Sequence, residues 1–286
     1  MVERIRWSDR ENAAAYRRFA DTYPMYRDTS RDLVTRARVE HARSVVDLCS
    51  GTGATTEAIL SVLPADGRVV AVDGSAAMQA EAQNAIDDAR VRYVVCRAEE
   101  FDRHIDEPVD AVICNSAIWQ TDMPATFAAA RRALAPGGRI VFNVGGHFVA
   151  LPRVEEPEQP APGFSELVVK YAIGGRSRRD HRTGPQRTAG SINELVRDAG
   201  LEVVSNDIVG YESTVEQNRA WLSIPIFAAR FDGLSYQQLM EILERAYQEV
   251  DKERTSITRW LIVTAAASKS DGAASPGRGS GTVRNR

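Results

Sequence analysis

Cysteine is scarce in this chain: Cys49, Cys96 and Cys114 are the three cysteines among 286 residues. They show none of the paired spacings that are typical of metal sites, and two of them lie inside apolar runs, where a free cysteine behaves as a small buried side chain. The sequence therefore predicts no metal site. A reducing, cytoplasmic environment fits this cysteine usage best.

An excess of positive charge is also missing, because 36 lysines and arginines face 39 aspartates and glutamates, for a net charge of −3. Nucleic-acid-binding proteins usually show the opposite balance. No stretch approaches the roughly 18 apolar residues of a membrane span, and the charged start lacks the apolar segment of a signal peptide. We expect a soluble protein with a small-molecule partner, without nucleic acid or membrane partners; a homodimer is left open.

From residue 44 onward, short β-rich apolar runs alternate with helix-like segments. This alternation is typical of a parallel sheet that helices cover on both faces. It predicts an α/β fold with a doubly wound, mostly parallel seven-stranded sheet. The expected strands are 44–48, 68–73, 91–97, 110–115, 139–144, 201–209 and 258–267.

Two interruptions of this alternation predict the domain organisation. A proline-rich and then basic segment breaks it first, and a segment with a long amphipathic helix breaks it again. Between them, Ser191 is expected to cap a helix that Gly200 ends. The expected units are a helical N-terminal lid (1–40), a ligand-binding core (41–145), an insertion or active-site loop (146–190), the rest of the core (191–268) with a cap insertion (211–256), and a disordered tail (269–286).

A glycine-containing loop follows the first expected strand, in the stretch VVDLCSGTGATTEAIL at 45–60. Asp47 stands near the exit of the strand, and Gly51 and Gly53 leave the backbone open to a ligand. Such a strand-loop-helix unit places backbone amides and a helix N-terminus around the ligand. The dinucleotide fingerprint G-x-G-x-x-G fits only in part, since Thr56 replaces its third glycine.

The same loop, DLCSGTG, resembles the first motif of class I S-adenosylmethionine-dependent methyltransferases, in which it surrounds the amino-acid part of the cofactor. The resemblance continues over residues 44–144, through the Ala98-Glu99 pair, the fourth-strand stretch DAVICNSAIW and the turn ALAPGGRIVF. One departure is visible, because Cys49 replaces the first glycine of D-x-G-x-G-x-G. Cysteine is small, so we expect cofactor binding to survive.

The resemblance implies a role for each acidic residue. The cofactor offers hydrogen-bond donors to a protein, and Asp47 would meet its ammonium group, Asp73 its ribose hydroxyls and Glu99 its adenine amine. Taken alone, Asp47 is equally explained as a helix cap and Asp73 as a turn residue. The full set of expected cofactor-binding residues is Asp47, Cys49, Gly51, Gly53, Asp73, Gly74, Ala98, Glu99, Asn115, Tyr16 and Tyr23.

Methyl transfer is an in-line displacement, so positioning an acceptor about 3 to 3.5 Å from the methyl group supplies most of the catalysis. His147, just after the fifth strand, is the leading candidate for a general base, although a structural role is an alternative. His181 is a second candidate. It lies in the basic run RSRRDHR, which is either a solvated loop or a segment that neutralises an acidic acceptor.

Aromatic residues are the candidates for substrate contacts. Trp119 follows the fourth strand as a stacking wall, and Trp221 and Phe227 form an apolar wall in the cap insertion; a core role is the alternative for all three. Tyr16 and Tyr23 are expected to close over the sulfonium cation, where ring faces contribute roughly 0.5 to 2 kcal/mol. Their helical spacing is also that of an ordinary packed helix face, which is the alternative.

The hypothesis with most support is therefore an S-adenosylmethionine-dependent methyltransferase that acts on a small organic molecule, in secondary metabolism. The sequence NSAI after the fourth strand differs from the N-P-P-Y of nucleic-acid amine methyltransferases. An enzyme of the same fold that catalyses a non-methylating step, such as cyclisation or elimination, is the alternative. A non-catalytic binding protein and a nicotinamide oxidoreductase are kept as further alternatives.

Overall fold

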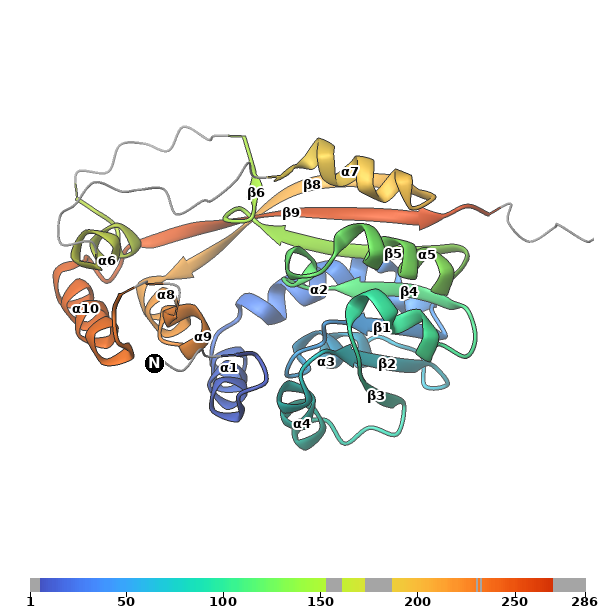
Figure 1. Ribbon diagram of the computed structural model, residues 1–286, viewed down its shortest axis with the longest axis horizontal. Helices are drawn as coiled ribbons and strands as arrows, with labels where there is room; N and C mark the ends of the chain where they lie inside the picture. The colour runs from blue at the N-terminus through green and yellow to red at the C-terminus, as the bar shows by residue number, and fades with distance from the viewer. Residues whose placement is uncertain (1–5, 153–160, 173–186, 230, 232, 270–286) are drawn as a thin grey trace, which may run out of the picture.

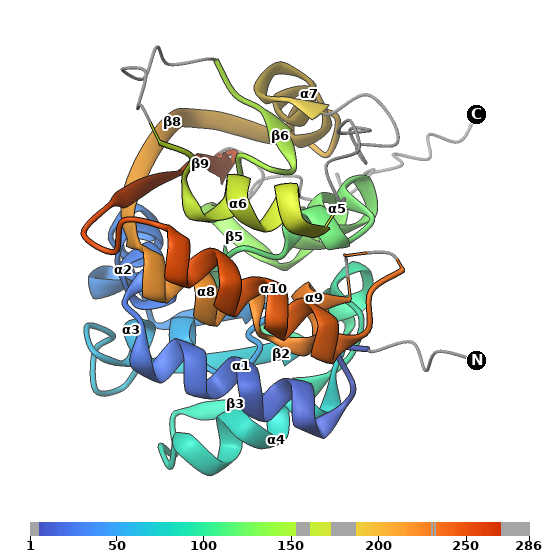
Figure 2. The ribbon, with the colours of Figure 1, turned by 90° about the vertical axis from the view of Figure 1, so that its left-hand side faces the viewer.

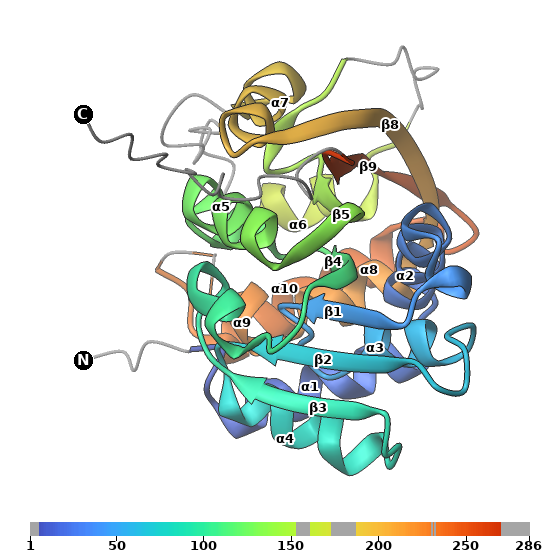
Figure 3. The same cartoon turned by 90° about the vertical axis from the view of Figure 1, so that its right-hand side faces the viewer.

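The computed structural model describes residues 6–152, 161–172, 187–229, 231 and 233–269. Seven strands form one sheet in the order β3-β2-β1-β4-β5-β9-β8, which Figure 3 shows from one side. β9 runs antiparallel to both of its neighbours and the other pairs are parallel. The predicted fold class is confirmed. The strands are β1 Ser44–Leu48, β2 Arg68–Asp73, β3 Val91–Val95, β4 Val109–Cys114, β5 Leu134–Gly145, β8 Leu201–Thr214 and β9 Thr255–Ala267.

Both faces of the sheet are covered by helices, which explains why its central strands are apolar without alternation. Val46 and Phe142 point to the face that α5 (Met123–Ala133) and α7 (Ala189–Asp198) cover. Val45 and Val141 point to the other face, against α2 (Met25–Ala37) and α3 (Ala54–Leu60). Short 3₁₀ turns η1 (Val39–His41), η2 (Ala98–His104) and η3 (Ile118–Gln120) connect the elements.

Helix boundaries follow local capping chemistry. Ser75 caps α4 (Ala76–Ala85), as its hydroxyl accepts a hydrogen bond from the Met78 amide. Ser191 was expected to be the cap of α7, and this is wrong. The cap is Thr188, and Ser191 is its reciprocal partner in a capping box at the third helical position. Gly200 follows the helix with a φ of 78°, as its expected role requires.

A helical cap stands beyond one end of the sheet (Figures 1 and 2). β8 and β9 continue as a two-stranded ribbon past Trp260, the last partner of β5, and carry the cap at their tip. Because these strands reach Thr214 and Thr255, the helical segment is shorter than the expected 211–256. The cap helices are α6 Phe164–Ala172, α8 Val215–Leu222, α9 Pro225–Ala228 and α10 Tyr236–Glu249, which share a core of their own. β6 (Val149–Ala150) and β7 (Arg187–Thr188) form a separate pair in the expected insertion.

The N-terminal helices α1 (Arg10–Thr22) and α2 connect the cap to the sheet. Phe19 and Tyr26 pack with Phe227 of the cap and Trp260 of β9 in one apolar cluster. The expected tail, from residue 270 onward, lies outside the described residues. No helix in the described ranges is long and apolar enough to cross a membrane.

Candidate active site

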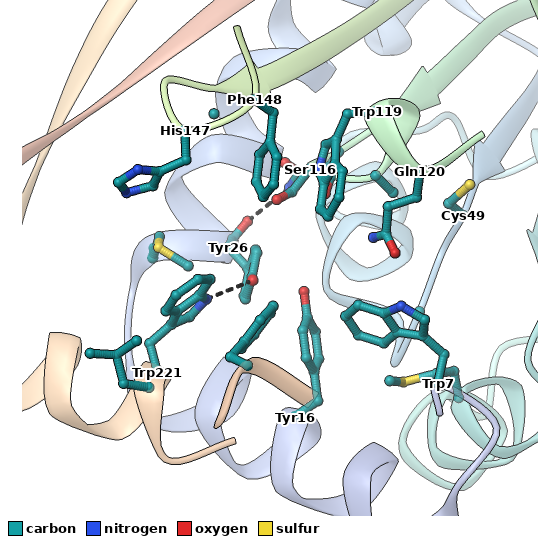
Figure 4. A pocket seen from close by; sticks show the side chains of 18 of the residues that line it. Trp7, Tyr16, Tyr26, Cys49, Ser116, Trp119, Gln120, His147, Phe148 and Trp221 are labelled. Carbon is teal, nitrogen blue, oxygen red and sulfur yellow. Dashed lines mark hydrogen bonds between the residues drawn. The ribbon is translucent and has the colours of Figure 1, made fainter. Parts of the chain in front are cut away.

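A cavity of about 930 Å³ opens between the carboxyl ends of the parallel strands and the cap (Figure 4). Ligands of open α/β sheets bind at this edge. Most of the site residues that the sequence predicted lie together there. These are Tyr16, Cys49, Gly51, Asp73, Gly74, Ala98, Glu99, Asn115, Trp119, His147, Trp221 and Phe227.

The glycine loop lies on one side of the cavity in a left-handed backbone conformation. Cys49 has a φ of 59°, Gly51 of 55° and Gly53 of 97°. A Cβ at Gly53 would lie 2.6 Å from Ile86 Cδ1, so this glycine is needed for packing as well as for its backbone conformation. Cys49 therefore keeps the conformation of the glycine that it replaces. The loop is also fixed to α1, because Arg17 donates a hydrogen bond to the Thr52 carbonyl at 2.9 Å.

Asp73, at the end of β2, holds the loop from the cavity side. Its carboxylate accepts hydrogen bonds from the Gly51 amide at 2.9 Å and from the Ser75 amide at 2.8 Å. Burial raises the pKa of Asp73, while these two hydrogen bonds oppose the rise. The residue therefore both lines the cavity and determines the shape of the loop.

Asp47 lies behind the loop and does not line the cavity. It is 1% exposed, and one carboxylate oxygen accepts a hydrogen bond from the Thr56 hydroxyl at 2.6 Å. The other oxygen has no hydrogen-bond partner. Thr56, which replaces the third glycine of the dinucleotide fingerprint, thus supplies the partner of Asp47. We therefore expect Asp47 to support the loop from behind, in place of the direct contact with the ammonium group that the sequence suggested.

Burial raises the pKa of Asp47 to about 7, although the Thr56 hydrogen bond opposes the rise. The folded protein thus holds this proton more tightly than the unfolded chain does. Stability from this group is complete below pH of about 4 and is lost as the pH rises through about 7. We expect Asp47→Asn to gain stability relative to the wild type between pH 5 and pH 8, by about 3 kcal/mol at most, because only the two pH units up to the folded pKa contribute. Urea unfolding at both pH values measures this, and an unchanged difference would contradict it.

Glu99 lines the cavity after β3 and also fixes a neighbouring loop. Its carboxylate accepts hydrogen bonds from the Asp122 amide at 2.8 Å and from Arg97 Nε at 3.2 Å. Burial alone would raise the pKa of Glu99, but these interactions outweigh it and the pKa lies below its usual value. Glu99 is therefore a carboxylate at neutral pH and ties the loop after β4 to the cavity.

An asparagine pair joins β4, β5 and α2 beneath the cavity. Asn143 is fully buried; its side chain accepts a hydrogen bond from the Ser116 amide and donates one to Asn115 Oδ1 at 2.9 Å. Asn115 in turn donates to Thr29 Oγ1 at 3.0 Å and Ser30 Oγ at 2.9 Å. The predicted site residue Asn115 thus lines the cavity and also connects the N-terminal helices to the sheet.

Aromatic rings face one another across the cavity. Trp119 and Phe148 stack with ring centroids 3.6 Å apart, and Trp221 and Phe227 stack at 3.9 Å. In Figure 4, the Trp119 and Phe148 rings lie opposite Trp221 and Tyr16. Burial, followed by the neighbouring Tyr26, raises the pKa of Tyr16 well above its usual value, so its phenol stays protonated.

Two further predicted residues, Gly53 and Tyr23, are described but do not line the cavity. Gly53 begins α3 and packs against Ile86. Tyr23 follows α1 in an extended conformation and packs on Phe19, with ring centroids 5.1 Å apart. His181 lies outside the described residues, so its role stays a prediction. For Tyr23, the ordinary packing that its helical spacing also allowed is what the structure has.

Sequence reasoning missed several residues that line the cavity. Trp7 precedes α1, and its carbonyl accepts a hydrogen bond from the Ser75 hydroxyl at 2.9 Å. Phe148 directly follows the candidate base His147, and this position in the sequence could have identified it as a cavity residue. Trp260 lies inside an apolar strand and resembled a core residue; it is 6% exposed, and its indole Nε1 has no hydrogen-bond partner.

Metal ligands are not gathered in the described part of the chain, where no group of three or more His, Cys, Asp or Glu could hold a metal ion.

Comparisons with known proteins agree with this architecture. Residues 45–138 match the family described as a methyltransferase domain. A trans-aconitate 2-methyltransferase from an Azoarcus species is 29% identical over 168 residues, which cover 58% of this chain and 62% of the relative. A second curated relative, from Mycobacteroides abscessus, is 30% identical over 113 residues, 37% of this chain and 52% of the relative. The chain thus spans less than two thirds of the length of the curated relatives that it matches.

Solved structures share the fold at low sequence identity. A chain from the complex that contains the Haloferax volcanii Trm112 methyltransferase activator aligns with a TM-score of 0.57 and 20% identity, covering 92% of this chain and 99% of that one. A Haemonchus contortus N-methyltransferase, solved with S-adenosylhomocysteine, aligns with a TM-score of 0.55 and 18% identity, over 92% and 60% of the two chains. Together with the strand order and the loop after β1, these findings support the predicted resemblance: residues 45–138 match a methyltransferase domain, and the chain shares the fold of the methyltransferases to which it is similar.

Proposed function

We propose that this protein binds S-adenosylmethionine and transfers its methyl group to a small organic molecule. The observation that carries the proposal is one cavity that holds the glycine loop, Asp73 and Glu99 on one side and the aromatic cap on the other. A cofactor and an acceptor can meet in such a cavity.

The residues of the loop side fit the cofactor. Asp73 and Glu99 are carboxylates for hydroxyl and amine donors, and the aromatic faces of Tyr16 and Trp119 suit a sulfonium cation. When bound, the cofactor supplies an electrophilic methyl group. The chain itself supplies the position of the acceptor and the exclusion of water by the cap, because the transfer depends mainly on alignment.

His147 is the proposed general base. It lines the cavity in the turn after β5, which the Phe148 amide closes by donating a hydrogen bond to the Gly145 carbonyl at 2.8 Å. We expect His147→Ala to lower kcat at least about tenfold with unchanged affinity for S-adenosylhomocysteine, if the acceptor must lose a proton. Steady-state kinetics and calorimetry measure the two quantities. A variant with full activity would remove His147 from the mechanism.

Calorimetry with S-adenosylmethionine and S-adenosylhomocysteine tests the proposal first, with nicotinamide dinucleotide as the control ligand. Product analysis with methyl-labelled cofactor and a set of acceptors, trans-aconitate among them, tests the transfer. Label in the acceptor supports methyl transfer. A changed acceptor without label supports the alternative, a cyclisation or elimination with the cofactor bound, for which Cys49 at the first glycine position leaves room.

Several finer assignments stay proposals. They are the division into lid, core, insertion and cap, the cytoplasmic location, the place in secondary metabolism and the formation of a homodimer. Cofactor binding without any turnover would favour a non-catalytic binding protein on the same fold.

A further inference from the structure

Among the described residues of the cap, those that line the cavity are uncharged. In α6, Ser165, Val168, Val169 and Ala172 line it, at the spacing of three and four residues that puts them on one helix face. The cap side of the cavity also receives Gln217, Asn218, Trp221 and Leu222 from α8, Phe227 from α9, and Phe231 and Leu234 before α10. None of these described residues is a lysine, arginine, aspartate or glutamate.

The charged residues of the same helices lie on the outer surface of the cap. Lys170 of α6 pairs with Glu249 of α10 at 3.9 Å. Arg219 of α8 pairs with Glu244 of α10 at 2.5 Å. Lys170 and Arg219 are therefore paired with carboxylates and are not among the residues that line the cavity.

The charges that do line the cavity lie on its loop side. They are Arg6 and Asp73, near the end of β2, and Arg97 and Glu99 after β3. These four charged side chains lie on the side of the cavity where the cofactor is proposed to bind. An anionic acceptor on the cap side would lose its hydration without meeting a described cation there, which costs several kcal/mol for each buried charge.

Neutral polar groups remain on the cap side near β9. Gln217 is 3% exposed and donates a hydrogen bond to Ser213 Oγ at 2.9 Å. Trp260 and Thr258 line the cavity here, and the buried indole N–H of Trp260 has no hydrogen-bond partner in the protein. These groups suit one neutral hydrogen-bonding function on an otherwise apolar molecule.

From this arrangement we infer that the acceptor is an uncharged, mainly apolar, ring-containing molecule, held between the Trp119–Phe148 and Trp221–Phe227 stacks (Figure 4). The inference rests on the proposed function and narrows it. It separates this chain from its Azoarcus relative, whose name gives an organic acid as the substrate.

A matched pair of probes tests the inference with S-adenosylhomocysteine bound to the full chain. At pH 7, 2-naphthol is neutral and 2-naphthoate carries one negative charge on the same ring system. We expect 2-naphthol to bind at least about tenfold more tightly than 2-naphthoate or trans-aconitate, by fluorescence titration. Equal or tighter binding of either anion, or no binding of 2-naphthol, would overturn the acceptor class. Failure of S-adenosylhomocysteine to bind would instead overturn the proposed function.

A charge placed in the cap gives a second test. Val169→Arg puts a cation on the cavity face of α6, so the preference for 2-naphthol over 2-naphthoate should shrink at least about tenfold. The same substitution at Val204, which is 51% exposed on β8 outside the cavity, is the control and should leave the ratio unchanged. Equal effects of the two substitutions would contradict a neutral cap side.

Discussion

Asp73→Ala is expected to weaken the binding of S-adenosylhomocysteine by about 1.5 to 3 kcal/mol, or roughly 10- to 150-fold. Two effects combine in this loss. The variant lacks the carboxylate for the ribose hydroxyls, and it also leaves the Gly51 and Ser75 amides without the acceptor that shapes the loop. Isothermal titration calorimetry measures the affinity. The second effect means that some stability is lost as well, which the sequence did not suggest.

Asp110→Ala is the matched control for this experiment. Asp110 also accepts hydrogen bonds from two backbone amides, those of Arg43 at 2.7 Å and Ser44 at 3.1 Å. It lies at the opposite end of the strands, outside the cavity. Its loss should lower stability to a similar extent and leave the affinity unchanged. If both variants lost the same affinity, Asp73 would act only through folding, and the ribose assignment would fail.

Asn143→Leu is expected to lower the free energy of unfolding by about 2 to 4 kcal/mol. Leucine is similar in size to asparagine, but it leaves the Ser116 amide without an acceptor and removes the hydrogen bond to Asn115. Since Asn115 binds Thr29 and Ser30, the attachment of α2 weakens as well. Urea unfolding followed by circular dichroism measures the loss.

An exposed asparagine provides the control for the second experiment. Asn206 lies on the outer strand β8 with its side chain in solvent. Asn206→Leu should change stability by no more than about 0.5 kcal/mol. A loss at Asn143 of this small size would show that the buried amide network contributes little.

The fold was predictable because its signals are local. Each strand of the cofactor half is a short apolar run, and the observed β1 and β2 coincide with the expected 44–48 and 68–73. The ends of the longer strands were harder to predict from the sequence. In the ribbon, β8 alternates between half-buried and exposed residues and β9 begins with exposed ones, so neither end carries the apolar run of a core strand.

The residues that line the cavity could be predicted where a sequence motif fixes the backbone. They were harder to predict where tertiary packing decides which side chains reach the cavity. Asp73 and Glu99 follow strands whose ends share one edge, so their meeting followed from topology. Asp47 also ends a strand, but the Thr56 side chain turns its carboxylate into the interior. Trp260 has the sequence context of a core residue, and only the ribbon that places it beside the cap reveals it as a residue of the cavity wall.

The separate core of the cap has an evolutionary consequence. Its buried residues, such as Leu167, Leu239 and Leu243, form a cluster distinct from the two that hold the sheet together. Substitutions confined to this cluster therefore leave the two clusters of the sheet unchanged. Descendants of one ancestral scaffold can in this way diversify toward new acceptors while their cofactor chemistry is inherited intact.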